Sequence, residues 1–178
     1  KTQRNADDPY LSPAEIYCDH KSGKAYISLS TASMIAVVDI RNEKLENRIS
    51  LPFYPGGLAI GRGDKTLYVT DKKPEGSLHV FSLSKLKTTK KIPLGHTPDA
   101  LKITPDGQLI FVANRFSNTV SVIDTDRNKV RKHISVDREP TAIDISPDGN
   151  LVAIANHLPN SAAVDPHISA RVTLINRH

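Results

Sequence analysis

The side chains with the most evident binding chemistry in this sequence are five cationic or imidazole groups, namely His96, Arg115, Arg138, His157 and His167. Guanidinium groups hold anions by charge-assisted hydrogen bonds, and imidazole nitrogens bind either anions or metal ions. The histidines match no metal-binding spacing, so we predict no metal site. We take the five residues as candidate ligand-binding residues. The alternative is that each is an ordinary exposed loop residue.

No residue pattern in the chain indicates catalysis. The sequence contains neither G-x-S-x-G nor H-E-x-x-H. Cys18 is the only cysteine, which excludes an internal disulfide and a multi-thiolate metal site. The segment CDH at 18–20 lacks the first cysteine of a C-x-x-C-H haem attachment site. We expect Cys18 to be a small buried hydrophobic residue on an inner strand, and we predict no catalytic residue and no cofactor in this chain.

Two short motifs resemble binding sites but are better explained as turns. DTDRN at 124–128 begins like a calcium loop, yet Lys129 and Ser135 stand where that loop needs glycine and a bidentate glutamate. GRGD at 61–64 contains a tripeptide that some adhesion receptors bind. Its glycine and aspartate are also ordinary turn residues, and short motifs give many false matches.

The elements that must position these residues follow from an internal repeat. Pro13, Pro55, Pro98 and Pro140 are spaced by 42, 43 and 42 residues. Each is followed by an alternating strand, a turn such as TPDG or SPDG, and two further strands. A more basic fourth strand follows three times, as KLENRISL, KLKTTKKIPL and KVRKHISV. Repeats of this length with four short strands are typical of β-propeller blades, and the frequent turns disfavour helical solenoids.

The charge and hydropathy of the chain fit this fold. There are 24 Lys and Arg against 19 Asp and Glu, a net charge of +5, and much of the excess lies in the predicted fourth strands. We expect these strands to be solvated outer edges. Because aromatic residues are few and tryptophan is absent, we predict no nucleic-acid partner. No apolar run has membrane-spanning length, so we predict no membrane span.

The segment PDALKITPDGQLIFVANRFSNTVSVIDT at 98–125 resembles the repeat of the YVTN β-propeller family. LYVTD at 67–71 contains the segment that names this repeat, with Asp71 in place of the usual asparagine. The first repeat diverges, since CDHKSG replaces the usual turn. The similarity extends over residues 13–176. It implies an all-β propeller of four-stranded antiparallel blades, and relatives that include surface-layer-like, redox-associated and lactonase-like proteins of bacteria.

We divide the chain into a lead-in segment, 1–12, and a partial propeller, 13–178. Its repeats cover 13–54, 55–97, 98–139 and 140–178, giving three complete blades and a partial fourth. Members that resemble this chain are usually seven-bladed, which at this period needs roughly 290 residues. We therefore expect the partner to be the remaining blades of the same protein or a second copy. Closure as four blades would need residues 1–12 to supply an outer strand, and their composition disfavours this.

The loops that join fourth to first strands and second to third strands share one face of a propeller, at the mouth of its channel, where ligands commonly bind. All five candidate residues fall on this rim. The loop at about 157–170 is longer than its counterpart at 114–119, and it resembles a loop of bacterial propellers that precede c-type haem domains of the cytochrome peroxidase type. A rim loop held by its prolines is the alternative.

Three functions are consistent with these observations. The first is a non-catalytic, extracytoplasmic (periplasmic or cell-surface) propeller that binds a protein or small molecule or acts as a scaffold; its location is implied by the family resemblance. The second is the propeller portion of a larger redox protein, with haem on domains outside this chain. The third is a lactonase-like hydrolase, for which Asp71, Arg138 and Glu139 are the candidate rim groups.

Overall fold

The computed structural model describes residues 12–158 and 170–177. Among these residues the chain forms four antiparallel sheets and one short 3₁₀ helix. In each sheet the strands are hydrogen-bonded in sequence order. The four-stranded antiparallel blades predicted from the repeat are therefore confirmed.

Each of the first three sheets has four strands, and the fourth has three. The first sheet comprises β1 (Pro13–Asp19), β2 (Lys24–Leu29), β3 (Met34–Asp39) and β4 (Lys44–Ser50). The second comprises β5 (Pro55–Ile60), β6 (Thr66–Asp71), β7 (Ser77–Ser82) and β8 (Lys87–Pro93). The third comprises β9 (Pro98–Ile103), β10 (Leu109–Asn114), β11 (Thr119–Asp124) and β12 (Lys129–Ser135), with helix η1 (Arg115–Ser117) between β10 and β11. The fourth comprises β13 (Arg138–Ile145), β14 (Leu151–Leu158) and β15 (Arg171–Asn176).

The turns between first and second strands have the geometry that their sequences predict. In TPDG, Gly107 has a φ of +70° and donates its N–H to the carbonyl of Thr104 at 2.7 Å. In SPDG, Gly149 has a φ of +74° and bonds Ser146 in the same way at 2.8 Å. Glycine adopts this left-handed conformation without a steric penalty, so both turns are tight and regular.

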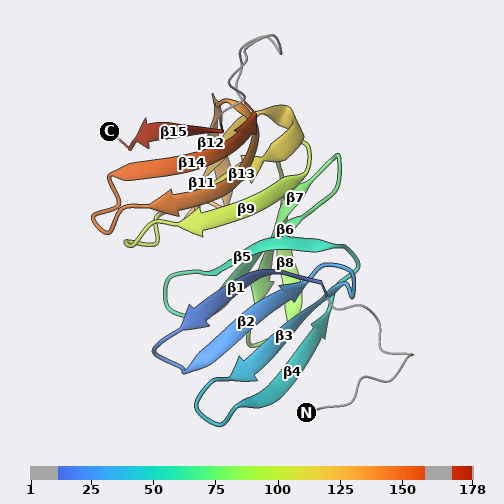
Figure 1. Ribbon diagram of the computed structural model, residues 1–178. Coiled ribbons are helices and arrows are strands. Elements are labelled where there is room, and N and C mark those ends of the chain that lie inside the picture. The colour runs from blue at the N-terminus through green and yellow to red at the C-terminus, as the bar shows by residue number, and fades with distance from the viewer. Residues whose placement is uncertain (1–11, 159–169, 178) are drawn as a thin grey trace.

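The sheets are arranged like the vanes of a fan, with the first at one end and the fourth at the other (Figure 1). The first strands lie side by side on the inner edge, β1 next to β5, β5 next to β9, and β9 next to β13. The outermost strands β4 and β8 expose nearly every residue, as predicted for the basic strands. Because each sheet has two apolar faces, it must pack against a neighbour on each side to bury both.

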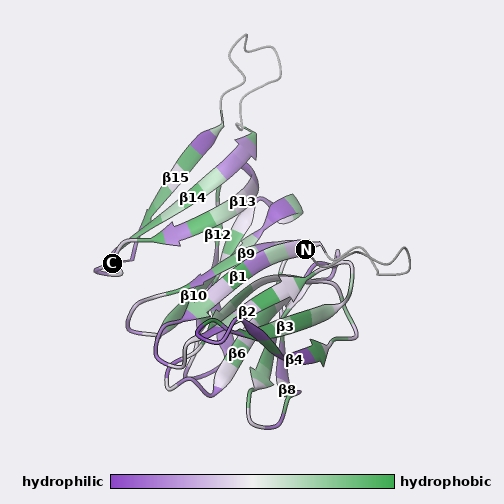
Figure 2. Cartoon of the chain, turned by 60° about the horizontal axis from the view of Figure 1, so that its bottom comes forward, coloured by the Kyte–Doolittle hydropathy of each residue, from purple (hydrophilic) through white to green (hydrophobic). Residues whose placement is uncertain are grey.

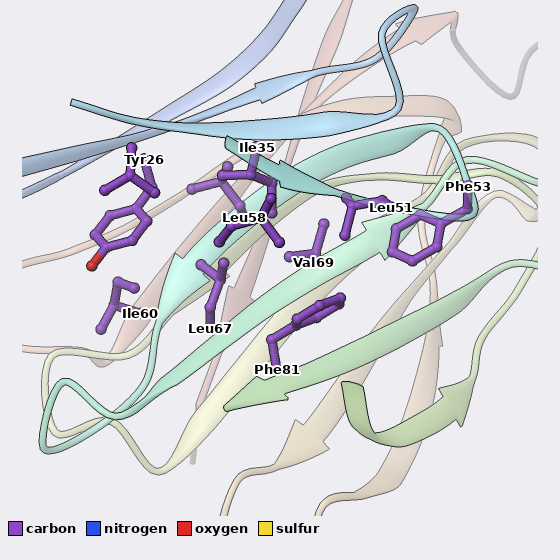
Figure 3. Close-up of a cluster of buried hydrophobic side chains, with 11 residues drawn as sticks. Tyr26, Ile35, Leu51, Phe53, Leu58, Ile60, Leu67, Val69 and Phe81 are labelled. Atoms are coloured by element: carbon purple, nitrogen blue, oxygen red, sulfur yellow. The ribbon is translucent and has the colours of Figure 1, made fainter. Parts of the chain in front are cut away.

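A separate hydrophobic cluster fills each boundary between successive sheets. Figure 3 shows the cluster between the first two sheets, in which Ile35 and Val37 of β3 pack with Leu58 of β5. The next boundary joins β7 to β9 through Leu78, Val80 and Leu101. The last joins β11 to β13, and its contributors from these strands are Val120, Val122 and Ile143. The same positions of the repeat thus form the core three times.

Two details differ from the sequence-based expectations. Cys18 is exposed, so the prediction of a buried side chain was wrong. Its counterparts, Ile60 among them, are covered by the preceding sheet, whereas β1 has no preceding sheet among the described residues. In addition, β14 continues through His157 to Leu158, so the start of the predicted long loop is strand. The rest of that loop, and the lead-in segment except for its last residue, lie outside the described residues.

Across the part of the chain that the structure describes, no helix is both long and apolar enough to cross a membrane.

Candidate binding site on the rim

Two loops and two strand ends meet on the rim where the third and fourth sheets adjoin. The loop from β8 to β9 carries His96, η1 carries Arg115 and Phe116, and the start of β13 carries Glu139. The end of β14 adds His157. We call these five residues the rim site.

The centre of the rim site is the carboxylate of Glu139. The Arg115 guanidinium donates to Glu139 Oε2 from Nη2 at 3.0 Å and from Nε at 3.3 Å. His157 Nδ1 lies 3.6 Å from the same oxygen. Arg115 belongs to the third sheet, whereas Glu139 and His157 belong to the fourth. The ion pair therefore spans the boundary between two blades.

An exposed aromatic ring lies beside this ion pair. Phe116 is exposed, and Arg115 Cζ is 5.1 Å from the centre of its ring. His96 meets the same ring edge-on, with ring centres 5.3 Å apart and planes at 84°. A guanidinium group near an aromatic face is attracted by the π-electrons. The two contacts hold Phe116 at the surface with its apolar area open to solvent.

Hydrogen bonds from backbone N–H groups to side-chain oxygens fix the loops that carry these side chains. Asn118 ends η1 in the left-handed conformation with a φ of +53°, and its Oδ1 accepts from the Glu139 N–H at 3.0 Å. Ser117 Oγ accepts from the His96 N–H at 2.7 Å. Asparagine tolerates the left-handed conformation better than most residues. The third-sheet loop thus anchors both flanking segments through side chains that follow Phe116.

The electrostatics of the rim site favour binding over proton transfer. The hydrogen bond from Arg115 lowers the pKa of Glu139, partial desolvation opposes the shift, and the charges of Arg115 and His157 add to the lowering. Glu139 is therefore a carboxylate at neutral pH and Arg115 is its counterion. A general acid or base needs a pKa near the working pH. This pair instead presents fixed charges next to an apolar ring.

The structure brings together three of the five candidate residues predicted from the sequence. His96, Arg115 and His157 belong to the rim site. Arg138 is exposed at the start of β13, and among the described residues no ion pair involves it. His167 lies outside the described residues. Phe116 was not among the residues predicted from the sequence. Arg115 and His157 directly follow asparagines at equivalent positions of the repeat, so the loop that carries Phe116 could be located on the rim from the sequence.

A second polar cluster, buried and chemically unusual, lies in the second sheet. Asp71 at the end of β6 is 1% exposed, and its Oδ2 lies 3.5 Å from Nε2 of His79 on β7. The His79 ring stacks on Phe53 with ring centres 4.0 Å apart. Within the described part of the chain, Asp71 Oδ1 and both ring nitrogens of His79 have no hydrogen-bond partner. Desolvation lowers the pKa of His79; Asp71 opposes this, while Lys91 and Lys73 add to it.

The candidate residues for lactone hydrolysis do not form one cluster. Asp71 pairs with His79 and with Lys73, whose Nζ is 3.7 Å away, while Glu139 pairs with Arg115 and not with Arg138. A hydrolase needs its acid, base and electrophilic group around one reacting atom. The arrangement of the described residues therefore gives no support to this function.

An open hollow of about 490 Å³ lies on the face opposite the rim, lined by the turns of the first three sheets. Three of its charged groups, Lys21, Asp64 and Asp106, form ion pairs. Lys21 Nζ is 3.8 Å from Asp64, and Asp106 receives a 2.6 Å hydrogen bond from Arg177. GRGD forms one of these turns, with Gly63 at a φ of +79°. The turn interpretation of that motif is confirmed.

The other short motif is also a turn. Asp124 accepts hydrogen bonds from Arg131 Nη2 at 2.8 Å and from the Arg127 N–H at 2.9 Å. Its carboxylate thus holds the hairpin between β11 and β12. Among the described residues, no three histidine, cysteine, aspartate or glutamate side chains gather in a way that could hold a metal ion.

Comparisons with known proteins agree with this architecture. A solved structure titled "Kuenenia stuttgartiensis Hydrazine Synthase" matches with a TM-score of 0.81 and 24% identity, over 99% of this chain and 49% of that chain. The chain thus spans about half the length of that neighbour, and the likeness concerns the fold. None of the curated proteins matches significantly. The family model described as YNCE-like beta-propeller matches residues 7–172, consistent with the repeat identified in the sequence. The chain belongs to the YNCE-like β-propeller family.

Proposed function

We propose that this chain is a non-catalytic binding or scaffold module whose ligand contacts the rim site. The observation that carries the proposal is the convergence of an exposed phenylalanine, an arginine and two histidines at one blade boundary. Aromatic residues and arginine dominate the energetic centres of protein interfaces. The ligand is a protein segment or a small molecule with an apolar group to cover Phe116.

The charge arrangement limits the polar part of this ligand. Arg115 is already neutralised by Glu139 at 3.0 Å, so an anion would have to displace that carboxylate. A ligand that leaves the ion pair intact binds at lower cost, with its apolar group on Phe116 and a hydrogen-bond acceptor facing His157 or His96. This favours a neutral or weakly charged ligand.

The test compares binding by the wild-type chain, a rim variant and a surface control. The rim variant is Phe116→Ser with His157→Ser, and the control is Leu45→Ser with Leu86→Ser, which changes two exposed leucines away from the rim. Each immobilised protein is offered an extract of its source cells, and retained molecules are quantified by mass spectrometry. We expect partners that the wild type and the control retain and the rim variant loses. Equal retention by all three would refute a role for the rim site.

A second candidate function is that of the propeller portion of a larger redox protein with c-type haem domains. The supporting observation is that the neighbour titled hydrazine synthase is about twice as long as the region matched here, so this fold occurs within a longer enzyme chain. Any haem would lie on domains outside this chain. The absorbance spectrum of the natural parent protein tests this, because c-type haem gives sharp bands on reduction. A parent without these bands excludes the function.

We also propose that the protein acts outside the cytoplasm, in the periplasm or on the cell surface, which rests on the resemblance to surface-layer-like propellers. Fractionation of source cells, followed by detection with an antibody against this chain, tests the location. Recovery with cytoplasmic markers alone would contradict it.

A further inference from the structure

The exposed tyrosine and phenylalanine side chains of the described residues all lie on the rim. Phe116 of the rim site is 53% exposed, and Tyr54, in the loop from β4 to β5, is 57% exposed. The other exposed large apolar residues of the described part of the chain are aliphatic. Exposed aliphatic residues are common on protein surfaces, whereas tyrosine and phenylalanine are enriched where proteins bind each other. Tyr54 is therefore a candidate second anchor beside the rim site.

Backbone hydrogen bonds connect Tyr54 to the rim site through the loops between them. The Lys72 N–H donates to the carbonyl of Tyr54 at 3.0 Å. The Thr97 N–H donates to the carbonyl of Lys73 at 2.9 Å, and the Arg115 N–H donates to the carbonyl of Thr97 at 3.1 Å. Figure 2 shows the third sheet, with β9 and β10, between the fourth sheet and the first two. The two aromatic residues thus share one fixed surface, which crosses the boundary between the second and third sheets inside the fan.

The separation of the two anchors follows from the repeat. Tyr54 directly precedes β5, Thr97 directly precedes β9, and these two first strands lie side by side. Phe116 adjoins the second of these loops, because its N–H donates to the carbonyl of His96 at 3.4 Å. Packed sheets are about 10 Å apart, so the anchors are separated by roughly 10–15 Å. Two side chains about four positions apart on one face of an extended peptide span about 13 Å.

The cationic side chains between the anchors are already paired with carboxylates. Lys72 Nζ is 2.7 Å from Asp99 Oδ1, and Lys73 Nζ is 3.7 Å from Asp71 Oδ2. Arg115 forms its ion pair within the rim site. A nucleic acid gains affinity by bringing its phosphates to lysine and arginine, so here each phosphate contact would have to break an ion pair. A peptide backbone is uncharged and leaves these pairs intact, which favours a peptide on this surface.

Building on the binding role proposed for the rim site, we propose that its ligand is an extended segment of a partner protein that also covers Tyr54. One apolar side chain of the segment packs on Phe116, and a second, about four positions away, packs on Tyr54. The backbone between them crosses the Lys72–Asp99 ion pair. The Tyr54 hydroxyl and the His96 ring supply hydrogen-bonding groups for the amides of the segment.

The test uses the full-length natural protein and a phage-displayed library of random peptides of about twelve residues, long enough to reach both anchors. Peptides that also bind the rim variant, Phe116→Ser with His157→Ser, are removed. We expect the remaining peptides to share two apolar residues about four positions apart. Tyr54→Ser and Phe116→Ser should each raise the dissociation constant of a selected peptide by about tenfold to a hundredfold, measured by fluorescence anisotropy. Leu45→Ser with Leu86→Ser should leave it unchanged, and circular dichroism confirms that every variant is folded.

Alanine substitutions in the peptide assign each apolar residue to one anchor. Replacing the residue that packs on Tyr54 should weaken binding to the wild type but hardly change binding to Tyr54→Ser, and the other residue should show the same relation to Phe116→Ser. Peptides that depend on Phe116 but not on Tyr54 overturn the extended segment and leave the proposed function standing. A selection without any rim-dependent peptide also overturns the segment, while the extract experiment decides the proposed function separately. A labelled oligothymidylate that binds more tightly than the peptides, and loses affinity in both single variants, would identify nucleic acid as the ligand instead.

Discussion

Replacing Asp71 by asparagine should stabilise the protein at mildly alkaline pH. The Asp71 side chain is 1% exposed, and one of its oxygens has no hydrogen-bond partner among the described residues. Leaving a buried polar group unsatisfied costs about 1–3 kcal/mol. The half-exposed Lys73 at 3.7 Å offsets about 1 kcal/mol or less. Asparagine has nearly the same shape, carries no charge to desolvate, and can donate from its amide to a neutral His79 ring nitrogen, so we expect the free energy of unfolding to rise by about 1–2 kcal/mol.

The chain offers a matched control at the equivalent position of the third sheet. Asn114 donates to Ser121 Oγ at 2.8 Å and to Thr119 Oγ1 at 3.0 Å, and accepts from the Gly95 N–H. Asn114→Asp removes both donated hydrogen bonds and introduces a buried charge, so it should lower the free energy of unfolding by about 2–4 kcal/mol. We thus expect asparagine to be more stabilising than aspartate at this position of the repeat in both blades.

Urea denaturation measures the change in the free energy of unfolding for both variants. The midpoint of thermal unfolding should shift by roughly 2–4 °C for each kcal/mol in a chain of this size. The assay is run above the pH at which His79 takes up a proton, since a protonated imidazole would pair with Asp71 and not with asparagine. If Asp71→Asn instead lowers the free energy of unfolding by more than about 1 kcal/mol, the carboxylate is satisfied in the native state and the reasoning fails.

Three further predictions concern pH and packing. Desolvation lowers the pKa of His79 below 6.5, so as the pH falls the unfolded chain binds a proton at this residue before the folded chain does. The free energy of unfolding should therefore fall as the pH drops below 6.5. His79→Ser should weaken this pH dependence when the free energy of unfolding is measured by urea denaturation. Desolvation raises the pKa of Asp106, but hydrogen bonds from Thr104, Gln108 and Arg177 outweigh it and lower the pKa from 3.8 to about 2. The contribution of Asp106 to stability is therefore present above pH 3.8 and is lost as the pH falls toward about 2. Arg177→Ala should raise that pKa, as read by NMR titration, and destabilise by about 1 kcal/mol after allowance for solvent screening. Gly57→Ala would place a Cβ 2.6 Å from the backbone oxygen of Asp99, so it should destabilise by about 1–3 kcal/mol in thermal unfolding.

The sheets could be predicted from the sequence because their signals are local. Proline spacing, Pro-Asp-Gly turns and strict alternation each act within a few residues, and all of them agreed on the same strands. Burial at the ends of the fan could not be predicted in this way. Cys18 and Ile16 belong to an inner strand with the usual pattern, yet both are exposed. Whether a strand residue is buried depends on the neighbouring sheet, which the strand sequence does not encode.

The rim site and the Asp71–His79 pair differ in how far the sequence could reveal them. Arg115 meets Glu139 across a blade boundary, and the loop geometry that joins them depends on the left-handed Asn118. Sequence spacing alone gives no such contact.

The Asp71–His79 pair, by contrast, is visible when the repeats are aligned. The two positions lie diagonally across the second and third strands of each sheet, close enough to interact. The equivalent positions are occupied by Leu29 and Ala36 in the first sheet and by Asn156 and Thr173 in the fourth. A 2.8 Å hydrogen bond joins Asn156 and Thr173. Each pair is matched in polarity, with an apolar residue facing an apolar one or a polar residue facing a polar one. Aspartate with histidine is the ionisable version of this pair, and so the one whose strength depends on pH.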